Sequence, residues 1–161
     1  MIADIVPATD EDAAFIGSNL RPHDMMELKA HGIDTDDATL VQSVVREILT
    51  TNSDARAVRI KDEPIAIYGI CPSQDPRIGH PWFLGTARIG SIRMQFIRES
   101  RVRLAEIACK YDLIWNTVWA GNRLHIRWLS WLEFSFKPQV LNPTTNEPFI
   151  PFHMEPNLVL R

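Results

Sequence analysis

The sequence has no long apolar run. None of its apolar stretches approaches the roughly 20 residues that a helix needs to cross a bilayer. The N-terminal sequence MIADIVPATDED contains neither the basic nor the apolar region of a secretory signal peptide. We therefore expect no membrane-spanning segment in this chain.

Cysteine is scarce, and repeats and low-complexity segments are missing. Cys71 and Cys109 are far apart and fit no metal-binding or redox spacing, so we expect two reduced thiols in a cytosolic setting and no metal site. With 161 residues and a hydrophobic content of 45%, the chain has the size and composition of a globular unit. The expectation is a single domain over residues 1–161.

The net charge of −3 is small, but the charges are unevenly distributed. Residues 1–54 carry eleven acidic and three basic side chains, whereas residues 55–161 carry nine acidic and fourteen basic ones. This asymmetry indicates either attraction of a phosphorylated ligand or an acidic partner, or a solvated helix face that offsets the acidic half. No nucleic-acid-binding motif is present, so we expect no nucleic-acid partner.

Local signatures of common enzyme classes are absent as well, including a Ser/His/Asp set, HExxH, a P-loop and an EF-hand. The most informative stretch that is present covers residues 113–136. Its apolar run Leu113–Ala120 predicts a buried strand, Gly121 supplies a turn, and Asn122 has the short polar side chain that caps a helix. The helix that follows to Phe134 has an apolar face at helical spacing, formed by Leu124, Trp128, Trp131 and Leu132. Such a unit is either a ligand site or an ordinary strand–helix junction.

Hydrophobic periodicity and turn residues predict the other elements. Helices are expected from Thr9–Asp12 onward and over Pro22–Gly32, Asp37–Thr50 and Gly90–Tyr111. Strands are expected at Ala3–Ala8, Ala55–Ile60, Ile65–Cys71, Pro81–Leu84, Phe134–Val140 and Phe149–Met154, with a loop over Pro72–His80. This order predicts an α+β fold with a mixed sheet.

Five short motifs occur in order along the chain. They are Arg21-Pro22-His23-Asp24, Pro81-Trp82-Phe83-Leu84-Gly85-Thr86, Phe96-Ile97-Arg98-Glu99-Ser100, Asn122 with Ile126-Arg127-Trp128-Leu129, and Pro151-Phe152-His153. In this arrangement the chain resembles the GNAT-like proteins of tailed phages, a group that includes the internal virion protein of short-tailed phages. The unit from Asn122 to Phe134 also looks like the last strand–helix unit of the GNAT acetyltransferase fold.

The resemblance implies a GNAT-like mixed central sheet of about six to seven strands, flanked by about four to five helices. In that fold, acetyl-CoA lies in a V between the fourth and fifth strands, and its pyrophosphate rests on amides at the next helix start, where the helix dipole favours an anion. The implied cofactor contacts are Phe83, Leu84, Gly85, Arg88, Ile89, Gly90, Ser91, Asn122 and Trp128. The glycine spacing of residues 85–91 departs from the family's phosphate pattern, so an ordinary strand–helix turn is the alternative.

The resemblance also indicates where catalytic groups would stand. Leu129 occupies the position of the tyrosine that protonates the departing thiolate, and Glu133 occupies that of a glycine. His80 and His125 are the candidates for a general base, with an exposed or capping role as the alternative for each. Asn116 is expected to satisfy buried backbone groups.

Two main hypotheses follow. The first is a virion-associated or assembly protein with a degenerate acetyltransferase site, which needs no cofactor and has phage proteins or further copies of itself as partners. The second is an acetyl-CoA-dependent N-acetyltransferase that acts on an amine of a protein or small molecule; binding of coenzyme A without turnover is a third possibility. The location implied is the virion or the host cytoplasm. Most of the five tryptophans are expected in the core, and exposed ones would indicate a protein contact.

Overall fold

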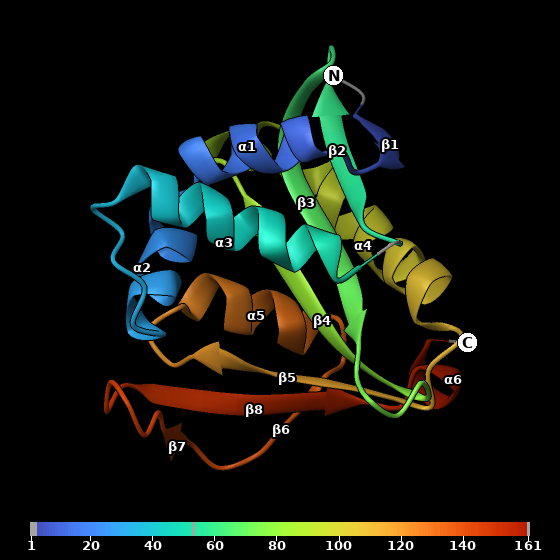
Figure 1. The fold of residues 1–161 in the computed structure, drawn as a ribbon. Coiled ribbons are helices and arrows are strands. Elements are labelled where there is room, and N and C mark those ends of the chain that lie inside the picture. The colour runs from blue at the N-terminus through green and yellow to red at the C-terminus, as the bar shows by residue number, and fades with distance from the viewer. Residues whose placement is uncertain (1–2, 53, 161) are drawn as a thin grey trace.

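A mixed eight-stranded sheet forms the centre of the computed structural model, which describes residues 3–52 and 54–160 (Figure 1). The strands are β1 (Asp4–Pro7), β2 (Arg56–Ile60), β3 (Glu63–Pro72), β4 (Ile78–Gly85), β5 (Leu113–Trp119), β6 (Ser135–Phe136), β7 (Val140–Leu141) and β8 (Pro148–Met154). Their order is β1-β2-β3-β4-β5-β8-β6, and β7 also pairs with β8. Only the β4–β5 pair of this described sheet is parallel. The predicted α+β class is confirmed.

Helices cover both faces of the sheet. They are α1 (Asp10–Ser18), α2 (Pro22–Ala30), α3 (Ala38–Thr50), α4 (Arg93–Ala108), α5 (Arg123–Trp131) and α6 (Pro156–Val159), with a 3₁₀ helix η1 (Ala87–Ile92) before α4. Because successive strand residues point to opposite faces, Leu84 packs in the core under α1, α2 and α3, whereas its neighbour Phe83 packs on the η1 and α4 side. Among the residues described, no helix has the length and apolar character that a membrane span requires.

Polar caps fix the starts of several helices. Thr9 and Asp12 form a reciprocal capping box at α1, and the side chain of Asp37 accepts the amide of Leu40 at α3. Asn122 accepts the amide of His125 at the start of α5. These contacts satisfy amides that a helix leaves unpaired, and they confirm the helix starts predicted at these residues.

Three predicted elements differ from the structure. The long helix begins at Arg93, because the side chain of Thr86 caps a tighter 3₁₀ turn over residues 87–92 first. Strand β4 begins at Ile78, since Gly79 pairs with Pro72 and extends the hairpin into the expected loop. The closing strand predicted over residues 134–140 is wrong. Only β6 and β7 form there, and Pro138, which has no amide to donate, lies between them.

The predicted burial of the aromatic segments is also wrong in part. Strand β5 is covered on the side of Ile114 and Val118, but Trp115 packs against the edge of His80 and stays 41% exposed. None of the five tryptophans is fully buried, and Trp131 is 47% exposed. Of the apolar face predicted for α5, Leu132 is buried and Trp128 packs against the core, but Leu124 and Trp131 are exposed, and Leu129 is buried in their place.

The turn after α5 has an unusual backbone. Glu133 adopts a φ of +71°, a left-handed conformation that glycine enters most easily, and it stands where the GNAT pattern has glycine. Its carboxylate forms an ion pair with Arg101 of α4. The turn therefore connects the end of α5 directly to α4.

Candidate functional site

Strands β4 and β5 separate soon after they meet. They pair at Ile78 with Leu113 and at Gly79 with Ile114, and no further residues of the two strands are paired in the described sheet. Beyond that point the side-chain amide of Asn116 on β5 donates to the carbonyl of Pro81 on β4 at 2.9 Å. The V expected between these strands is present, and the prediction that Asn116 satisfies backbone is confirmed.

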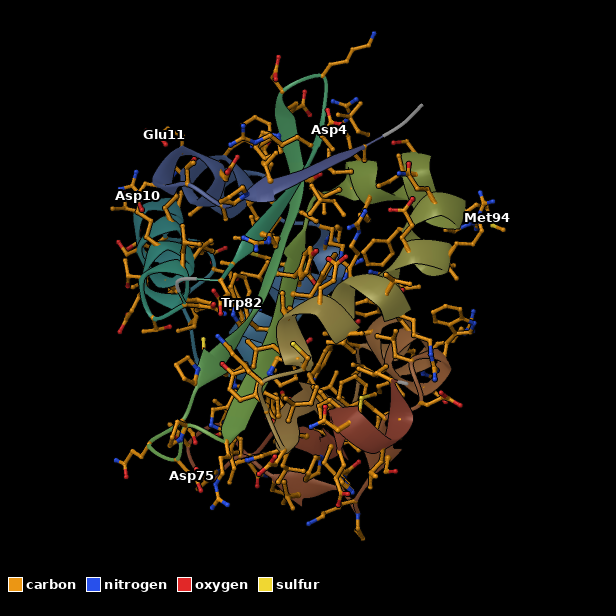
Figure 2. The ribbon with its side chains drawn as sticks, turned by 90° about the vertical axis from the view of Figure 1, so that its right-hand side faces the viewer. Asp4, Asp10, Glu11, Asp75, Trp82 and Met94 are labelled. Carbon is orange, nitrogen blue, oxygen red and sulfur yellow. The ribbon has the colours of Figure 1, made fainter. Side chains whose placement is uncertain are left out.

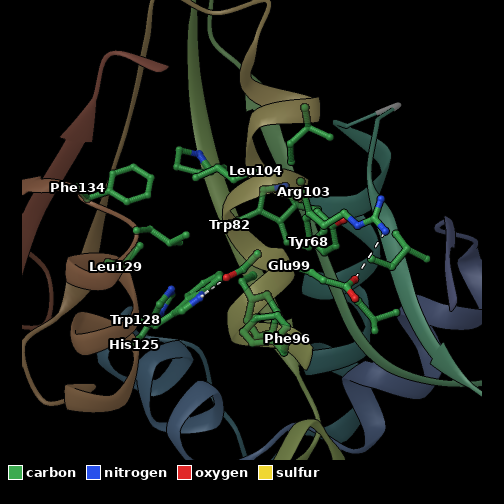
Figure 3. A pocket seen from close by; sticks show the side chains of 18 of the residues that line it. Tyr68, Trp82, Phe96, Glu99, Arg103, Leu104, His125, Trp128, Leu129 and Phe134 are labelled. Atoms are coloured by element: carbon green, nitrogen blue, oxygen red, sulfur yellow. Dashed lines mark hydrogen bonds and ion pairs between the residues drawn. The ribbon is translucent and has the colours of Figure 1, made fainter. Parts of the chain in front are cut away.

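Two cavities lie on opposite sides of this opening. One, of about 70 Å³, is mainly apolar and lies under α4 and α5 (Figure 3). The other, of about 170 Å³, is more polar and is bordered by α2, Ile48 of α3 and the two diverging strands. Both are lined by Pro81, Trp82, Phe83, His125 and Phe152. These residues therefore form the wall between the cavities.

Three aromatic rings pack together on the α4–α5 side of the V, where they line the apolar cavity. Phe83 of β4, Phe96 of α4 and Trp128 of α5 contact one another in pairs, with ring centroids 5.1–5.3 Å apart. The indole N–H of Trp128 donates to Ser100 of α4 at 3.2 Å, as Figure 3 shows, and this bond fixes the ring. Two predicted cofactor residues, Phe83 and Trp128, are thus brought together, but they pack against each other.

The backbone at the end of β4 is already hydrogen-bonded within the protein. The amide of Gly85 donates to the carboxylate of Asp24 at 2.9 Å, and the amide of Thr86 donates to the carbonyl of Ile65 at 2.9 Å. The amide of Ile89 donates to the carbonyl of Thr86 at 3.2 Å. An anion needs unpaired amides at this turn, and these three would have to exchange a protein partner for it.

The other predicted cofactor residues of this turn lie in varied settings. The guanidinium of Arg88 pairs with Glu63 at 2.6 Å, and the hydroxyl of Ser91 donates to the carbonyl of Arg88. Leu84 points to the opposite face of the sheet and lines the polar cavity. A Cβ added at Gly90 would meet no atom within 4 Å, so this glycine is not required by packing.

Helix α2 holds the β4 side of the V through the Arg-Pro-x-Asp motif. Asp24 is buried; its carboxylate accepts the Arg21 guanidinium at 2.8 Å as well as the Gly85 amide. The backbone amide of Arg21 donates to the carbonyl of Gly85, and its guanidinium lies over the ring of Phe83. Burial raises the pKa of Asp24, and the charge of Arg21 opposes this shift without cancelling it.

The same helix holds the β5 side through Glu27. Its carboxylate accepts the amide of Trp119 at 3.1 Å and the side-chain amide of Asn122 at 2.6 Å, and lies 3.7 Å from Nδ1 of His125. Burial acts to raise the pKa of Glu27, but His125, together with the two amide donors, holds this pKa below its usual value. Arg21, Asp24 and Glu27 together therefore bind both diverging strands.

The two histidine candidates lie in different places. His125 lines both cavities beside Glu27, and a carboxylate next to an imidazole is an arrangement that can orient a general base. His80 lines neither cavity; its Nδ1 lies 3.0 Å from the carbonyl of Trp115. Leu129, at the position of the missing acid, is buried and has no proton to donate.

The motif segments meet at the V. Residues of all five contribute: Arg21 and Asp24 bind Gly85, Phe96 and Ser100 contact Trp128, and Phe152 lines both cavities. Sequence reasoning missed Glu27. The signal that could have found it is its place three residues after Asp24, on the same side of a short helix.

Gly121 is required by close packing, which gives a stability prediction. A Cβ there would lie 2.4 Å from the ring of Trp119, whose indole N–H is held by Glu147 at 3.1 Å. We expect Gly121→Ala to lower the free energy of unfolding by about 1–3 kcal/mol, measured by urea denaturation. Gly90→Ala is the matched control, because its Cβ meets open space. Equal stability of both variants would contradict the packing argument.

The architecture is that of the GNAT fold. A GNAT-family acetyltransferase from Bacillus anthracis superimposes with a TM-score of 0.68 and 7% identity, covering 96% of this chain and 95% of that protein. One from Streptococcus pneumoniae gives a TM-score of 0.60 and 11% identity, covering 95% and 98%. At such low identities the likeness establishes the fold, including the V between β4 and β5.

The sequence itself points to a narrower group. Residues 58–139 match the family described as probable scaffold protein Gp13 of bacteriophage T7. The probable scaffold protein gp13 of Escherichia phage T7 is 31% identical over 114 residues, which cover 66% of this chain and 67% of that protein. The chain therefore belongs to the Gp13 family of phage proteins and has the GNAT fold.

Proposed function

We propose that the chain is an assembly protein of a phage particle that keeps the GNAT fold without transferring acetyl groups. The observation that carries this proposal is the packing of Phe83, Phe96 and Trp128 into the α4–α5 side of the V. The engaged amides of Gly85 and Thr86 support it, since a pyrophosphate would compete with bonds already made. Fold likeness alone does not assign function, and the family relationship supplies the assembly role.

An assembly role implies partners and a location for this chain. A family named for a scaffold protein suggests proteins of the growing particle as partners, present in the host cytoplasm during assembly and retained in or on the virion. The partly exposed tryptophans Trp115 and Trp131 are suited to such contacts, because tryptophan is enriched at protein interfaces. Fractionation of particles from infected cells tests this: the chain should sediment with assembling or mature particles. Its presence only in the monomer fraction would overturn the proposal.

Titration with acetyl-CoA tests the loss of the cofactor site. We expect no measurable heat for the wild type at about millimolar ligand, a concentration at which a weak site of roughly −4 kcal/mol would half fill. If heat is seen, Gly90→Glu distinguishes the sites. A ligand at the η1 turn would bind the variant more weakly, because the new carboxylate repels its phosphates, and a Cβ at Gly90 meets no atom within 4 Å. Binding that this variant weakens would show that the V admits the cofactor, and it would refute the proposed loss of the cofactor site.

The pairing of Glu27 with His125 favours one alternative, an N-acetyltransferase in which His125 is the general base. That enzyme would have to move Phe96 and Trp128 to admit the thioester. An amine panel with radiolabelled acetyl-CoA separates the possibilities. Transfer that is lost in His125→Gln would establish the enzyme, and cofactor binding without transfer would establish a binding protein.

A further inference from the structure

Helices α4 and α5 carry arginines that have no ion-pair partner. Arg93 and Arg98 of α4 and Arg123 and Arg127 of α5 are exposed, and none pairs with an acidic side chain among residues 3–52 and 54–160. On the same two helices, Arg101 and Arg103 of α4 are neutralised locally, by Glu133 and by Glu99 and Glu106. The four arginines are therefore available to an external anionic surface.

Large apolar side chains stand among these arginines. On α4, Met94 and Val102 are each 60% exposed and flank Arg98 at steps of four residues. On α5, Arg123, Arg127 and Trp131 have the same spacing, and Leu124 is exposed beside them. Such steps place side chains on one side of a helix. We call the outward residues Arg93, Met94, Arg98, Val102, Arg123, Leu124, Arg127 and Trp131 the basic face.

This composition indicates a protein contact. Arginine, methionine and aromatic residues are enriched at protein interfaces, whereas isolated exposed apolar residues are common on any surface. Here they alternate with unpaired charges on two helices that share one side of the sheet. An acidic surface that also exposes apolar side chains would complement the basic face.

The opposite side of the same molecule has those properties. Helix α1 exposes Asp10, Glu11 and Phe15, and the adjacent α3 region exposes Asp36, Leu40 and Glu47; we call these six the acidic face. In the part of the chain that the structure describes, none of its four carboxylates is in an ion pair. A single exposed arginine of α3, Arg46, interrupts the described acidic surface. Figure 2 shows Asp10 and Glu11 at one margin and Met94 at the other, with the sheet between them.

We propose that copies of this chain associate head to tail, with the basic face of one copy against the acidic face of the next. Because the two faces are different surfaces, the contact is heterologous and builds rings or open chains, unlike a symmetric pair. This association rests on the assembly role proposed above, and it adds further copies of the chain as partners. A second copy is favoured over other anionic partners, because every copy of the chain carries both the basic face and the complementary acidic face.

Charge reversal with mixing tests the contact. Arg98→Glu with Arg127→Glu cancels the net charge of the basic face, because its other two arginines remain, and Asp36→Lys with Glu47→Lys does the same to the acidic face. In sedimentation velocity, the wild type should associate as its concentration rises, whereas each variant alone should stay monomeric. An equimolar mixture should associate again, because the intact acidic face of the arginine variant meets the intact basic face of the other variant. Lys61→Glu with Lys137→Glu makes the same charge change as the arginine variant, away from both faces, and should behave as the wild type.

Salt gives an independent readout. Raising the salt from about 0.05 M to about 0.5 M shortens the Debye length roughly threefold, and association should weaken at least about tenfold. A wild type that stays monomeric at low salt, or a mixture that fails to associate, would overturn the proposal. Binding of a short DNA duplex by the wild type that is lost only in the arginine variant would also overturn it, since that result assigns the basic face to nucleic acid. The result of the acetyl-CoA titration does not depend on these outcomes, so the loss of the cofactor site is tested separately.

Discussion

Replacing Asp24 by alanine should lower the free energy of unfolding by about 3–5 kcal/mol. The carboxylate is buried and joins the guanidinium of Arg21 to the amide of Gly85, so its removal leaves a largely buried charge and a backbone donor without their partner. The loss combines the cost of an unpaired charge with that of an unsatisfied amide. Urea or thermal denaturation followed by circular dichroism measures it.

Asp36→Ala is the matched control for this prediction. Asp36 is exposed and lies outside ion pairs of the described residues, and such surface substitutions usually change stability by within about 0.5 kcal/mol. Asp24→Asn keeps the size of the side chain and an oxygen that can accept the Gly85 amide. It should therefore lose less stability than alanine. A change below about 1 kcal/mol for Asp24→Ala would mean that Arg21 and Gly85 find other partners.

Replacing Glu27 should have a comparable effect with a characteristic pH dependence. Glu27→Ala removes the acceptor of two hydrogen bonds, from Trp119 and Asn122, and the anion beside His125, so we expect a loss of about 3–5 kcal/mol at neutral pH. Because the pKa of Glu27 is lowered in the folded protein, its ionised form contributes stability above its unfolded pKa of about 4.5. This contribution disappears as the pH falls through the lower folded pKa.

The comparison of wild type with Glu27→Gln isolates that dependence. Their difference in free energy of unfolding should be nearly constant from pH 7 to about pH 5 and should shrink below the unfolded pKa of Glu27, about 4.5. The contribution of Asp24 to stability has the opposite pH dependence, because its pKa is raised in the folded protein. Its raised pKa makes its contribution complete below about pH 3.8 and reduces it as the pH rises through the folded value. A pH-independent difference for Glu27→Gln would contradict the lowered pKa.

The features that sequence reasoning predicted well depend on near neighbours. A cap such as Thr9 or Asn122 acts on an amide a few residues along the chain, so a short window contains both partners. The β2–β3 hairpin is another example, because its turn needs only the positive φ values of Lys61 and Asp62. The V itself was expected from the family resemblance, not from local pattern.

The features that it missed depend on distant partners. Glu27 receives donors from Trp119 and Asn122, which lie more than ninety residues away, so no local pattern marks it as central. Strand β5 reads as buried on both faces, but the departure of β4 leaves Trp115 uncovered. In α5, Leu124 and Trp131 form one apolar stripe and Ile126 and Leu129 form another. Only tertiary contacts decide which stripe is buried.

The left-handed turn at Glu133 couples the end of α5 to α4. A residue other than glycine costs about 1 kcal/mol in this conformation, and the bond from Arg101 helps to hold it. Displacement of α4 would break that bond and free the turn to relax, so α4 and the end of α5 should loosen as one unit. In hydrogen exchange, amides on the two sides of this joint would then open with a shared free energy.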